Sequence, residues 1–192
     1  SNGHLELLEG LDFRVIPTAG LYDTFMISVK DNDTLSDETV IVIQDDFANL
    51  QVLSLVASGA YDVIFHQAAV PRVSYSVEHP AKTTEVNITK TVALFEAARG
   101  MVDRIVWASS SSIYGGADIL PTHESTTKDP KSPYAWQKSA IEDVAKMFGK
   151  LYNLDIICLR YFNVFGPGQY GDSPYSTAVS AWCNNIKFLK PL

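Results

Sequence analysis

Cysteine is scarce in this sequence, and we expect neither a disulfide framework nor a cysteine-based metal site. The two cysteines, Cys158 and Cys183, have no paired spacing, and no cluster of histidines accompanies them. Cys158 falls in an apolar, strand-like run and Cys183 in a helical pattern, so we expect both to be buried free thiols and expect no bound metal. Free thiols suit the reducing cytoplasm, where we expect the protein to act.

The sequence also lacks a basic run and a long apolar run. It has 15 Lys and Arg against 22 Asp and Glu, which gives a net charge of −7 and a pI near 5.0. This balance argues against general binding to nucleic acids or to anionic membrane surfaces. No apolar stretch approaches the roughly 18 residues that suggest a transmembrane helix, and no signal peptide or repeat is evident. We therefore expect an acidic, soluble protein without nucleic-acid or membrane partners.

The composition is otherwise that of a folded domain. Hydrophobic residues make up 46% and charged residues 19% of the 192 residues. A chain of this length and composition can form one domain with a sizeable core. Nothing in it indicates disorder.

Residues 104–138 contain the clearest functional pattern. Residues 104–108 form a short apolar run typical of a buried parallel strand, and four serines follow at 109–112. Ligands bind at the carboxyl ends of such strands, so we expect the serines to lie at a site. Pro133 favours the first turn of a helix, which would place Tyr134 and Lys138 one turn apart on the same helix face.

A tyrosine beside a lysine is a candidate general base. The phenol of a free tyrosine has a pKa of about 10, and a nearby ammonium group favours the phenolate and lowers that pKa. A serine can then relay the proton. The spacing of Tyr134 and Lys138 alone does not establish this chemistry, because the same spacing is common on solvated helix faces.

Further segments occur with this pattern in an order and spacing that resembles the extended short-chain dehydrogenases/reductases. The nearest resemblance is to the NAD-dependent epimerase/dehydratase family, which acts on nucleotide sugars. The resemblance covers about Val40 to Leu192. The motifs together are specific to the family, although each motif alone is modest evidence. The segments are Phe65-His66-Gln67-Ala68-Ala69, Asn87 with its neighbours, Ser109 to Gly115, Tyr134-x-x-x-Lys138, and Leu159-Arg160-Tyr161-Phe162-Asn163-Val164-Phe165-Gly166-Pro167.

The resemblance implies an α/β fold with a Rossmann-like, doubly wound parallel sheet. The family's first strand leads into a G-x-x-G-x-x-G loop, which is absent here. We expect that the chain begins just after that loop, and real divergence is the alternative. Residues 1–175 would then form an NAD-binding domain without its first strand, and residues 176–192 would begin a substrate-binding domain that is mostly missing.

The local patterns predict several elements. We expect the end of a helix at residues 4–9, closed by Gly10, and then a short strand at 13–16. Apolar runs predict buried strands at 39–43, 61–65 and 156–161. Helices are predicted over 50–57, 81–99, 134–152 and 176–190.

The resemblance also assigns the contacts with NAD. Two alternatives stay open: Asp46 could instead cap the helix at 50–57, and Asn87 could lie on a solvated helix face rather than hold the loops around the cofactor. A lone histidine after a strand is usually structural, so His66 receives no role. The assigned residues are Asp46, Phe47, Ala68, Ala69, Asn87, Tyr134, Lys138 and Tyr161.

The catalytic residues that the resemblance implies are Ser110, Tyr134 and Lys138. Ser110 is chosen because it lies four residues before Tyr114, where the family has its catalytic Ser or Thr. Sugar 4,6-dehydratases carry Asp-Glu in the next two positions, where this chain has serines. Residues assigned to the substrate are Ser76, Ser111, Ser112 and Asn163.

The resemblance therefore predicts an NAD-dependent nucleotide-sugar 4-epimerase of the UDP-glucose 4-epimerase type, working through a transient 4-keto intermediate. Two alternatives remain: an NADP-linked sugar-nucleotide reductase or a dehydratase of the same family, and a non-catalytic dinucleotide-binding relative. We also expect a homodimer, formed as in the family by the helices at 81–99 and 134–152. Val92, Phe95, Met147 and Phe148 are the apolar residues on these helices that could serve a second face.

Overall fold

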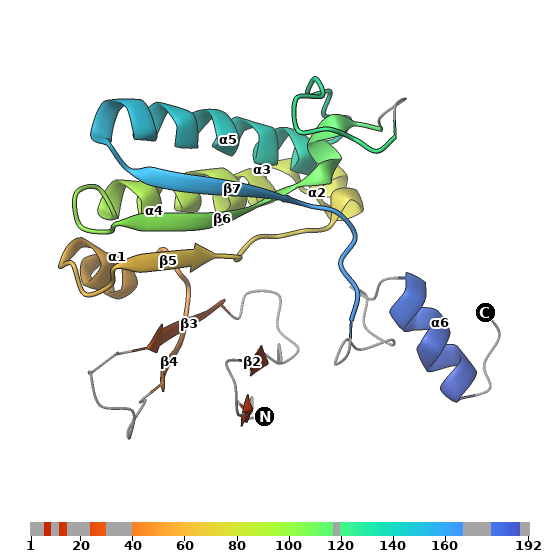
Figure 1. Ribbon diagram of the computed structural model, residues 1–192, viewed down its shortest axis with the longest axis horizontal. Coiled ribbons are helices and arrows are strands. Elements are labelled where there is room, and N and C mark those ends of the chain that lie inside the picture. Colours follow the sequence, from red (N-terminus) through yellow and green to blue (C-terminus); the bar gives the residue numbers. More distant parts are fainter. Residues whose placement is uncertain are drawn as a thin grey trace.

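A three-stranded parallel sheet forms the centre of the computed structural model, which describes residues 6–8, 12–14, 24–29, 40–116, 120–166 and 178–188. Its strands, in spatial order, are β5 (Val63–His66), β6 (Arg104–Ser110) and β7 (Asp155–Tyr161). Helices connect each strand to the next parallel one (Figure 1). The predicted α/β fold with a parallel sheet is confirmed.

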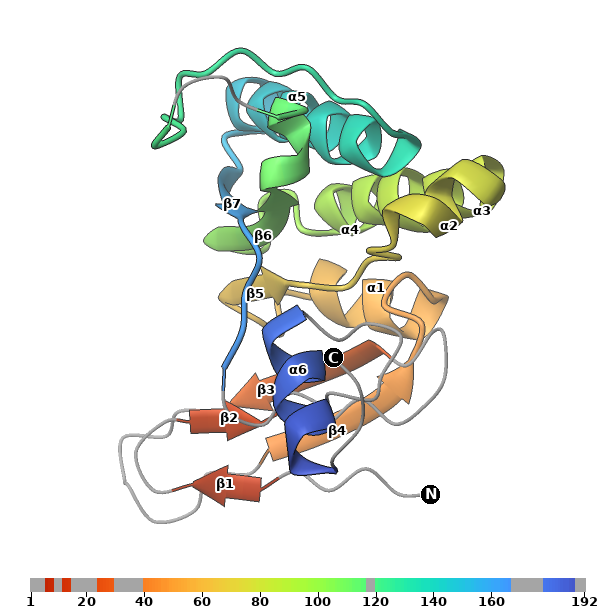
Figure 2. The same cartoon turned by 90° about the vertical axis from the view of Figure 1, so that its right-hand side faces the viewer.

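Helices cover one face of this sheet and bury residues of the central strand β6. Figure 2 shows the sheet nearly edge-on, with α1 (Leu50–Ala57), α4 (Thr91–Ala97) and α5 (Pro133–Tyr152) on one side. Ile105 and Trp107 of β6 face these helices and are fully buried, because successive strand residues point to opposite faces. The core around them contains Val56, Leu94, Phe95, Ile141, Ala145 and Phe148.

The other face of the sheet is more exposed than predicted. Phe65, Val106 and Ile157 are aligned across the three strands, and Phe65 and Ile157 are exposed. The runs at 61–65 and 156–161 were both predicted to be buried. Apolar composition alone does not reveal how many faces of a strand are covered, and the helices described here cover one.

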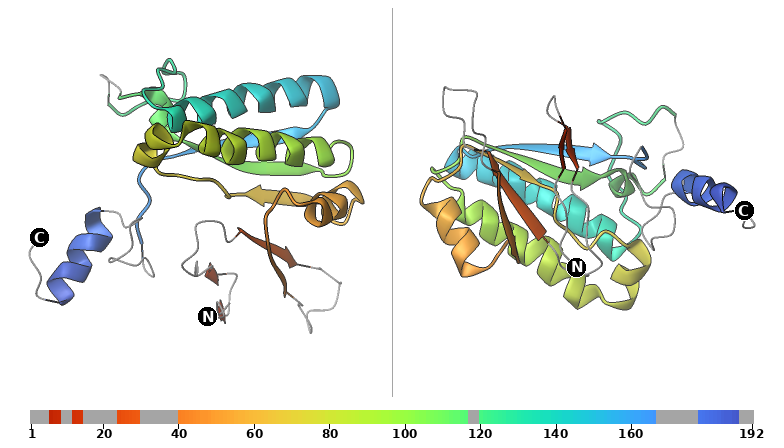
Figure 3. Two further views of the ribbon diagram at one scale, coloured as in Figure 1. Left: turned by 180° about the vertical axis from the view of Figure 1, so that it is seen from behind. Right: turned by 90° about the horizontal axis from the view of Figure 1, so that it is seen from below.

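The predicted helix at 81–99 is present with an irregular centre. It comprises α3 (Pro80–Thr84), the π-helical turn η1 (Glu85–Lys90) and α4, and it follows α2 (Val73–Glu78). Gly100, with φ of 68°, follows its end, as predicted. In the view from behind, α4 and α5 run side by side in front of the sheet (Figure 3).

Helix α5 has the boundaries that the sequence predicts. Ser132 caps it by accepting a hydrogen bond from the Ala135 N–H, Pro133 occupies the first turn, and Asn153 ends it with φ of 54°. Tyr134 therefore lies in the first turn of α5, and its side chain is buried. In the described part of the chain, no helix has the length and apolar character that crossing a membrane requires.

The remaining strands pair in two antiparallel sheets. β1 (Glu6–Leu8) pairs with β2 (Asp12–Arg14), and β3 (Thr24–Val29) pairs with β4 (Val40–Asp45). The predicted helix end at residues 4–9 is therefore wrong for 6–8, where strand pairing prevails because so short a segment cannot nucleate a helix. The strand predicted at 39–43 is present, but its partner is β3, since an apolar run does not specify a partner.

Helix α6 (Ala178–Lys187) lies within the helix predicted at 176–190. None of the described residues 178–188 is buried. Cys183 is exposed and Cys158 is half-buried, so the prediction of a buried thiol is wrong for Cys183. The helical pattern around Cys183 is present, but no described element covers it.

Candidate active site

The carboxyl end of β6 and the first turns of α5 bring together Ser110, Tyr134 and Lys138. Ser110 is the last residue of β6, and Tyr134 and Lys138 are buried on the face of α5 that contacts the sheet. Burial raises the pKa of the Tyr134 phenol, and a hydrogen bond with the Ser110 side chain acts in the opposite direction. The three side chains predicted to be catalytic thus lie at one place.

Lys138 is buried, which excludes the interpretation of a solvated helix pair. Its Nζ donates a hydrogen bond to the Ala108 carbonyl oxygen at 2.6 Å and lies 4.6 Å from the centroid of the Trp107 ring. Burial lowers the pKa of Lys138 to about 8. Its Nζ is 5.8 Å from the centroid of the Tyr134 ring.

The pKa of Tyr134 differs from the sequence prediction. Lys138 was expected to lower it, whereas in this structure burial raises it above 10.0. The reason is geometric: the ammonium group of Lys138 is bonded to the Ala108 carbonyl, and desolvation of the phenol is the larger effect.

The serines after Ser110 form a short 3-10 turn, η2 (Ser111–Tyr114). Ser112 donates to the Ser110 Oγ both from its backbone N–H, at 3.2 Å, and from its hydroxyl, at 2.9 Å. Ser111 and Ser112 are half-buried beside the candidate catalytic group. Their predicted contacts with substrate remain predictions.

Ser76 of α2 lies behind the backbone of Tyr134. Its hydroxyl donates to the Val73 carbonyl at 2.6 Å and accepts from the Tyr134 N–H at 3.0 Å, and the residue is fully buried. The predicted contact between Ser76 and substrate stays a prediction. What the structure shows is a bond that fixes the start of α5.

Asn87 is buried and joins two segments that border the site. Its Oδ1 accepts from the Val70 N–H at 2.8 Å, and its Nδ2 donates to the Val70 carbonyl at 3.1 Å and to Gln137 Oε1 at 2.8 Å. Val70 directly follows Ala68 and Ala69, so Asn87 fixes the loop that ends β5. A solvated face is excluded, and the loop-holding alternative is the one that the structure shows.

Asp46 does not cap α1, because Asn49 does. Asn49 Oδ1 accepts from the Val52 N–H at 2.7 Å, while Asp46 accepts from the Ala48 N–H at 2.9 Å and forms an ion pair with Lys90. The capping alternative for Asp46 is therefore wrong. Asparagine is as good an N-cap as aspartate, and Asn49 directly precedes Leu50, where the helix begins.

Phe47 and His66 pack against each other in the core. Phe47 is buried, and the centroids of the two rings are 4.7 Å apart. The His66 Nε2 is 3.1 Å from the Thr91 Oγ1, and burial lowers the pKa of His66 to about 3, so the ring is neutral at physiological pH. His66 has the structural role expected for it, and a contact between Phe47 and adenine remains a prediction.

The end of β7 places Tyr161 beside Ser110, since these two residues are aligned in the parallel pairing. Tyr161 and Asn163 are exposed. Phe162, between them, stacks on Tyr114 with 6.4 Å between ring centroids.

Within the residues that the structure describes, no group of three or more His, Cys, Asp and Glu could hold a metal ion.

Glu142 and Arg160 are residues at this site that the sequence analysis missed. Glu142 lies eight residues after Tyr134, on the same face of α5, and its carboxylate binds Ser109 and Arg160. The available signal was a charged residue inside the apolar run at 156–161, because a charge in a buried strand needs a partner.

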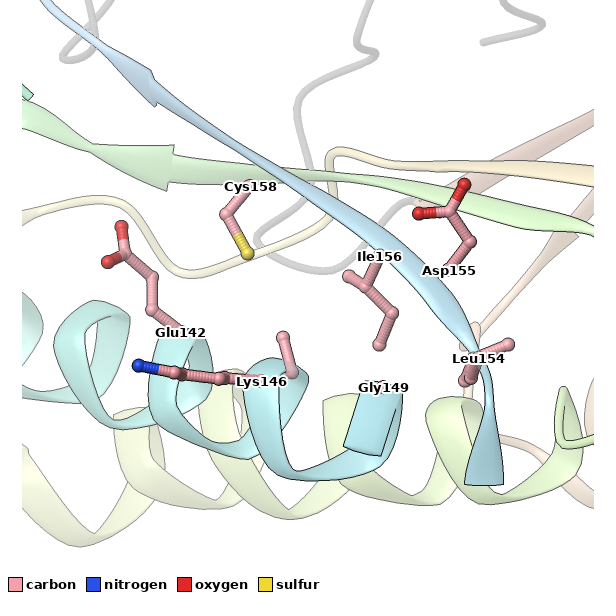
Figure 4. Close-up of a pocket in the computed structure, with 8 residues that line it drawn as sticks. Glu142, Lys146, Gly149, Leu154, Asp155, Ile156 and Cys158 are labelled. Carbon is pink, nitrogen blue, oxygen red and sulfur yellow. The ribbon is translucent and has the colours of Figure 1, made fainter. Parts of the chain in front are cut away.

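A surface hollow of about 380 Å³ lies between α5, from Glu142 onward, and the strand β7, away from Ser110, Tyr134 and Lys138. In Figure 4, Glu142 and Lys146 reach toward it from α5, and Ile156 and Cys158 from β7. Burial raises the pKa of Cys158 to about 11, so its thiol is protonated at neutral pH. Apart from Glu142, the hollow contains none of the side chains described above as site residues.

Comparison with known proteins relates this chain to one family. The model of the NAD dependent epimerase/dehydratase family matches residues 20–191. A UDP-glucuronate 4-epimerase of Thermodesulfobacterium geofontis is 35% identical over 164 residues, which are 82% of this chain and 50% of that protein. A dTDP-D-glucose 4,6-dehydratase of Homo sapiens is 28% identical over 166 residues, 85% of this chain and 47% of that protein.

Solved structures agree with this relationship. UDP-glucuronic acid 4-epimerase from Bacillus cereus, in complex with UDP-glucuronic acid and NAD, is 30% identical and has a TM-score of 0.67, covering 78% of this chain and 46% of that one. The Rossmann-like fold predicted from the sequence is thereby confirmed. The chain spans half or less of the length of the curated relatives it matches.

Proposed function

This chain belongs to the NAD-dependent epimerase/dehydratase family, and we propose that it is part of a nucleotide-sugar 4-epimerase that acts on UDP-sugars. The observation that carries the proposal is the arrangement of Ser110, Tyr134 and Lys138. The Tyr134 phenol lies near enough to the Ser110 side chain for that side chain to lower its pKa, and Lys138 is buried beside them at the carboxyl end of a parallel strand. This is the edge at which α/β sheets bind ligands.

The residues at this edge suit NAD. Ala68 and Ala69 are small, and Asn87 fixes the loop that carries them, which lets a dinucleotide approach the backbone. An ammonium group has three N–H donors, and Lys138 gives one of them to the Ala108 carbonyl, so we propose that the others bind ribose hydroxyls. Asp46, Phe47 and Tyr161 are proposed to complete the cofactor contacts, and Ser76, Ser111, Ser112 and Asn163 those with substrate.

In the proposed reaction, Tyr134 removes the proton of the sugar 4-hydroxyl, directly or through Ser110. NAD supplies the redox chemistry by accepting a hydride from C4 and returning it. Between these two events the 4-keto sugar rotates so that its other face is presented to the cofactor. Tyr134 gives the proton back when the carbonyl is reduced from that face.

Tyr134 needs assistance to act as a base, because burial raises the pKa of its phenol. The hydrogen bond from Ser110 favours the phenolate. Lys138 Nζ lies 5.8 Å from the centroid of the Tyr134 ring. We propose that its charge, once cofactor and substrate are bound, also favours the phenolate.

The turn after Ser110 favours epimerisation over dehydration. Removal of water from the sugar requires an acid near the leaving hydroxyl. The two positions after Ser110 are serines, and the Ser112 hydroxyl is bonded to Ser110. The nearby carboxylate of Glu142 is bonded to Ser109 and Arg160.

The test is product analysis with the full-length protein. UDP-glucose, UDP-glucuronate and UDP-N-acetylglucosamine are each incubated with NAD, and the products are separated by chromatography and weighed by mass spectrometry. A 4-epimerase converts at least one of them into a product of equal mass and different retention. Loss of one water would identify a dehydratase, and no conversion would overturn the proposal.

We also propose that the protein is a cytoplasmic homodimer, paired through α4 and α5. Phe95 and Phe148, two of the residues predicted to serve this face, are instead buried in the core. Met147, Leu151 and Tyr152 are exposed near the end of α5 and support the proposal.

A further inference from the structure

Ser109, Glu142 and Arg160 form a second group of polar side chains next to the candidate catalytic group. Glu142 is one helical turn after Lys138 and two turns after Tyr134, on the same face of α5. Its carboxylate accepts from the Ser109 Oγ at 2.6 Å, from Arg160 Nε at 2.9 Å and from Arg160 Nη2 at 2.8 Å. Burial alone would raise the pKa of Glu142, but hydrogen bonds from Arg160, Ser109 and Lys128 hold that pKa below its usual value.

Arg160 extends this group to the segment that follows β6. Its Nη1 donates to the Tyr114 hydroxyl at 2.8 Å and to the Glu124 carbonyl at 2.7 Å. Its guanidinium carbon lies 5.1 Å from the centroid of the Tyr114 ring. One side chain of β7 therefore contacts α5, the turn after Ser110 and the loop at 120–131.

The loop is held at further points. Lys128 Nζ lies 3.1 Å from Glu142 Oε2 and 3.0 Å from Asp143 Oδ1. Asp129 donates from its backbone N–H to the Ile113 carbonyl at 2.8 Å. The loop consequently bonds to both α5 and the turn that carries Ser112.

Three successive turns of α5 contact three successive residues at the end of β6. Tyr134 is hydrogen-bonded to Ser110, Lys138 to the Ala108 carbonyl, and Glu142 to Ser109. Ser109 is covalently joined to Ser110, so its position limits where the Ser110 hydroxyl can lie.

We propose that Glu142 and Arg160 are positioning residues, which hold Ser110 and the loop at 120–131 in place against Tyr134 and Lys138. The inference rests on the proposed function. Neither residue touches the reacting atoms; both act through Ser109, Tyr114 and the loop. Glu142 is buried and Arg160 half-buried, and an ion pair in such surroundings contributes little net stability, because desolvation offsets much of the attraction. Its effect is therefore expected in the geometry of the site.

The first experiment measures turnover in full-length variants. Glu142→Gln preserves the shape of the side chain and removes its charge, and Asp143→Asn is the matched control, because Asp143 is exposed and binds Lys128 without touching Arg160 or Ser109. We expect Glu142→Gln to lower kcat on the order of 10- to 100-fold with KM and NAD affinity little changed, as misplacement of a reacting group does. Asp143→Asn is expected to retain kcat. Equal kcat in the two variants would overturn the proposal.

A double variant separates positioning from simple stability. Glu142→Met with Arg160→Met removes both charges and leaves no unpaired ion in the core, a change that is often neutral for stability. We expect the double variant to unfold at a temperature close to wild type while kcat stays low. Recovery of kcat along with stability would show a merely structural role and would contradict the proposal.

Hydrogen exchange decides the same question without reference to activity. In Glu142→Gln, amides of residues 109–116 and 120–131 should exchange faster than in wild type. In Asp143→Asn, which leaves Lys128 its bond with Glu142, amides of residues 109–116 should exchange as in wild type. Unchanged exchange in Glu142→Gln would refute the positioning role. If wild type converts no UDP-sugar, the proposed function fails, and the exchange data still decide whether Glu142 and Arg160 hold this region.

Discussion

The two halves of α5 fill their buried positions with different kinds of residue. In the first half, up to Glu142, the apolar Ala135 and Ile141 are buried together with Tyr134, Gln137, Lys138 and Glu142, and the last three are hydrogen-bonded to other elements. In the second half the buried residues are Ala145 and Phe148.

The difference follows from the direction of the helix. The amino end of α5 lies at the carboxyl end of β6, and α/β sheets bind ligands at the carboxyl ends of their strands. The carboxyl end of α5 lies over the amino ends of the strands. Polar side chains are buried where their chemistry can be used, and apolar ones where only packing is needed. Changes in the first half should thus alter chemistry, and changes in the second should alter stability or association.

The largest expected effect is on stability, at Phe148. Its ring packs against Phe95 and Tyr152, with centroids 5.9 and 5.0 Å away. Phe148→Ala should lower the free energy of unfolding by about 3–5 kcal/mol, because it leaves a cavity in the core. Urea unfolding measures this change. Met147→Ala, one residue earlier and exposed, is the matched control and should change stability by less than about 0.5 kcal/mol.

The next effect concerns the burial of Lys138. Its pKa is about 8 in the folded protein against 10.5 ordinarily, so between these values the folded state binds fewer protons than the unfolded state. The contribution of Lys138 to the free energy of unfolding therefore rises with pH across this window, by up to about 3 kcal/mol. Lys138→Met, which cannot titrate, should show its greatest advantage over wild type at neutral pH and lose it toward pH 10.

Urea unfolding at several pH values, without cofactor, checks this expectation. Lys150→Met, at an exposed position of the same helix, is the matched control. If the difference between Lys138→Met and wild type is constant with pH, Lys138 is not buried as a charged group.

Tyr134→Phe should affect chemistry and leave the fold intact. Loss of a general acid–base group lowers turnover at least 10²-fold, which corresponds to about 2.7 kcal/mol in the barrier. The assay is conversion of a UDP-sugar by the full-length variant, with circular dichroism to confirm folding. Tyr152→Phe, near the other end of the helix, is the control and should retain turnover. Similar rates for the two variants would mean that the halves do not differ in function.

The smallest effect on monomer stability is expected at Leu151. This side chain is exposed, so Leu151→Lys should change the free energy of unfolding by no more than about 0.5 kcal/mol. It should nevertheless weaken the proposed dimer, because it places a charge in an apolar contact. Sedimentation velocity of wild type and variant at micromolar concentration measures this, and a wild-type monomer would exclude the dimer.

The elements that carry the candidate catalytic residues could be predicted from sequence, because their boundaries depend on local rules. Helical spacing puts Tyr134 and Lys138 on one face, and Pro133 with Ser132 defines where that helix starts. An apolar run followed by serines identified β6 and its end. These features do not depend on how distant segments pack.

The contacts that determine the pKa values could not be predicted in this way. The bond from Lys138 to the Ala108 carbonyl and the burial of the Tyr134 phenol depend on the spacing between α5 and the sheet. The partners of Glu142 come from β6, β7 and a loop that are far apart in sequence. Strand partners were likewise unpredictable, as the pairing of β3 with β4 shows.

The fate of the hydrogen on C4 tests the proposal that Ser110, Tyr134 and Lys138 support reversible oxidation at C4 of a nucleotide sugar. The full-length protein is incubated in ordinary water with NAD and a UDP-hexose that carries deuterium at C4, and the 4-epimer is isolated and examined by NMR and mass spectrometry. We expect deuterium to be retained at C4 of the product, because the hydride leaves and returns without exchange with water. A 4-epimer in which solvent hydrogen has replaced the deuterium would contradict it.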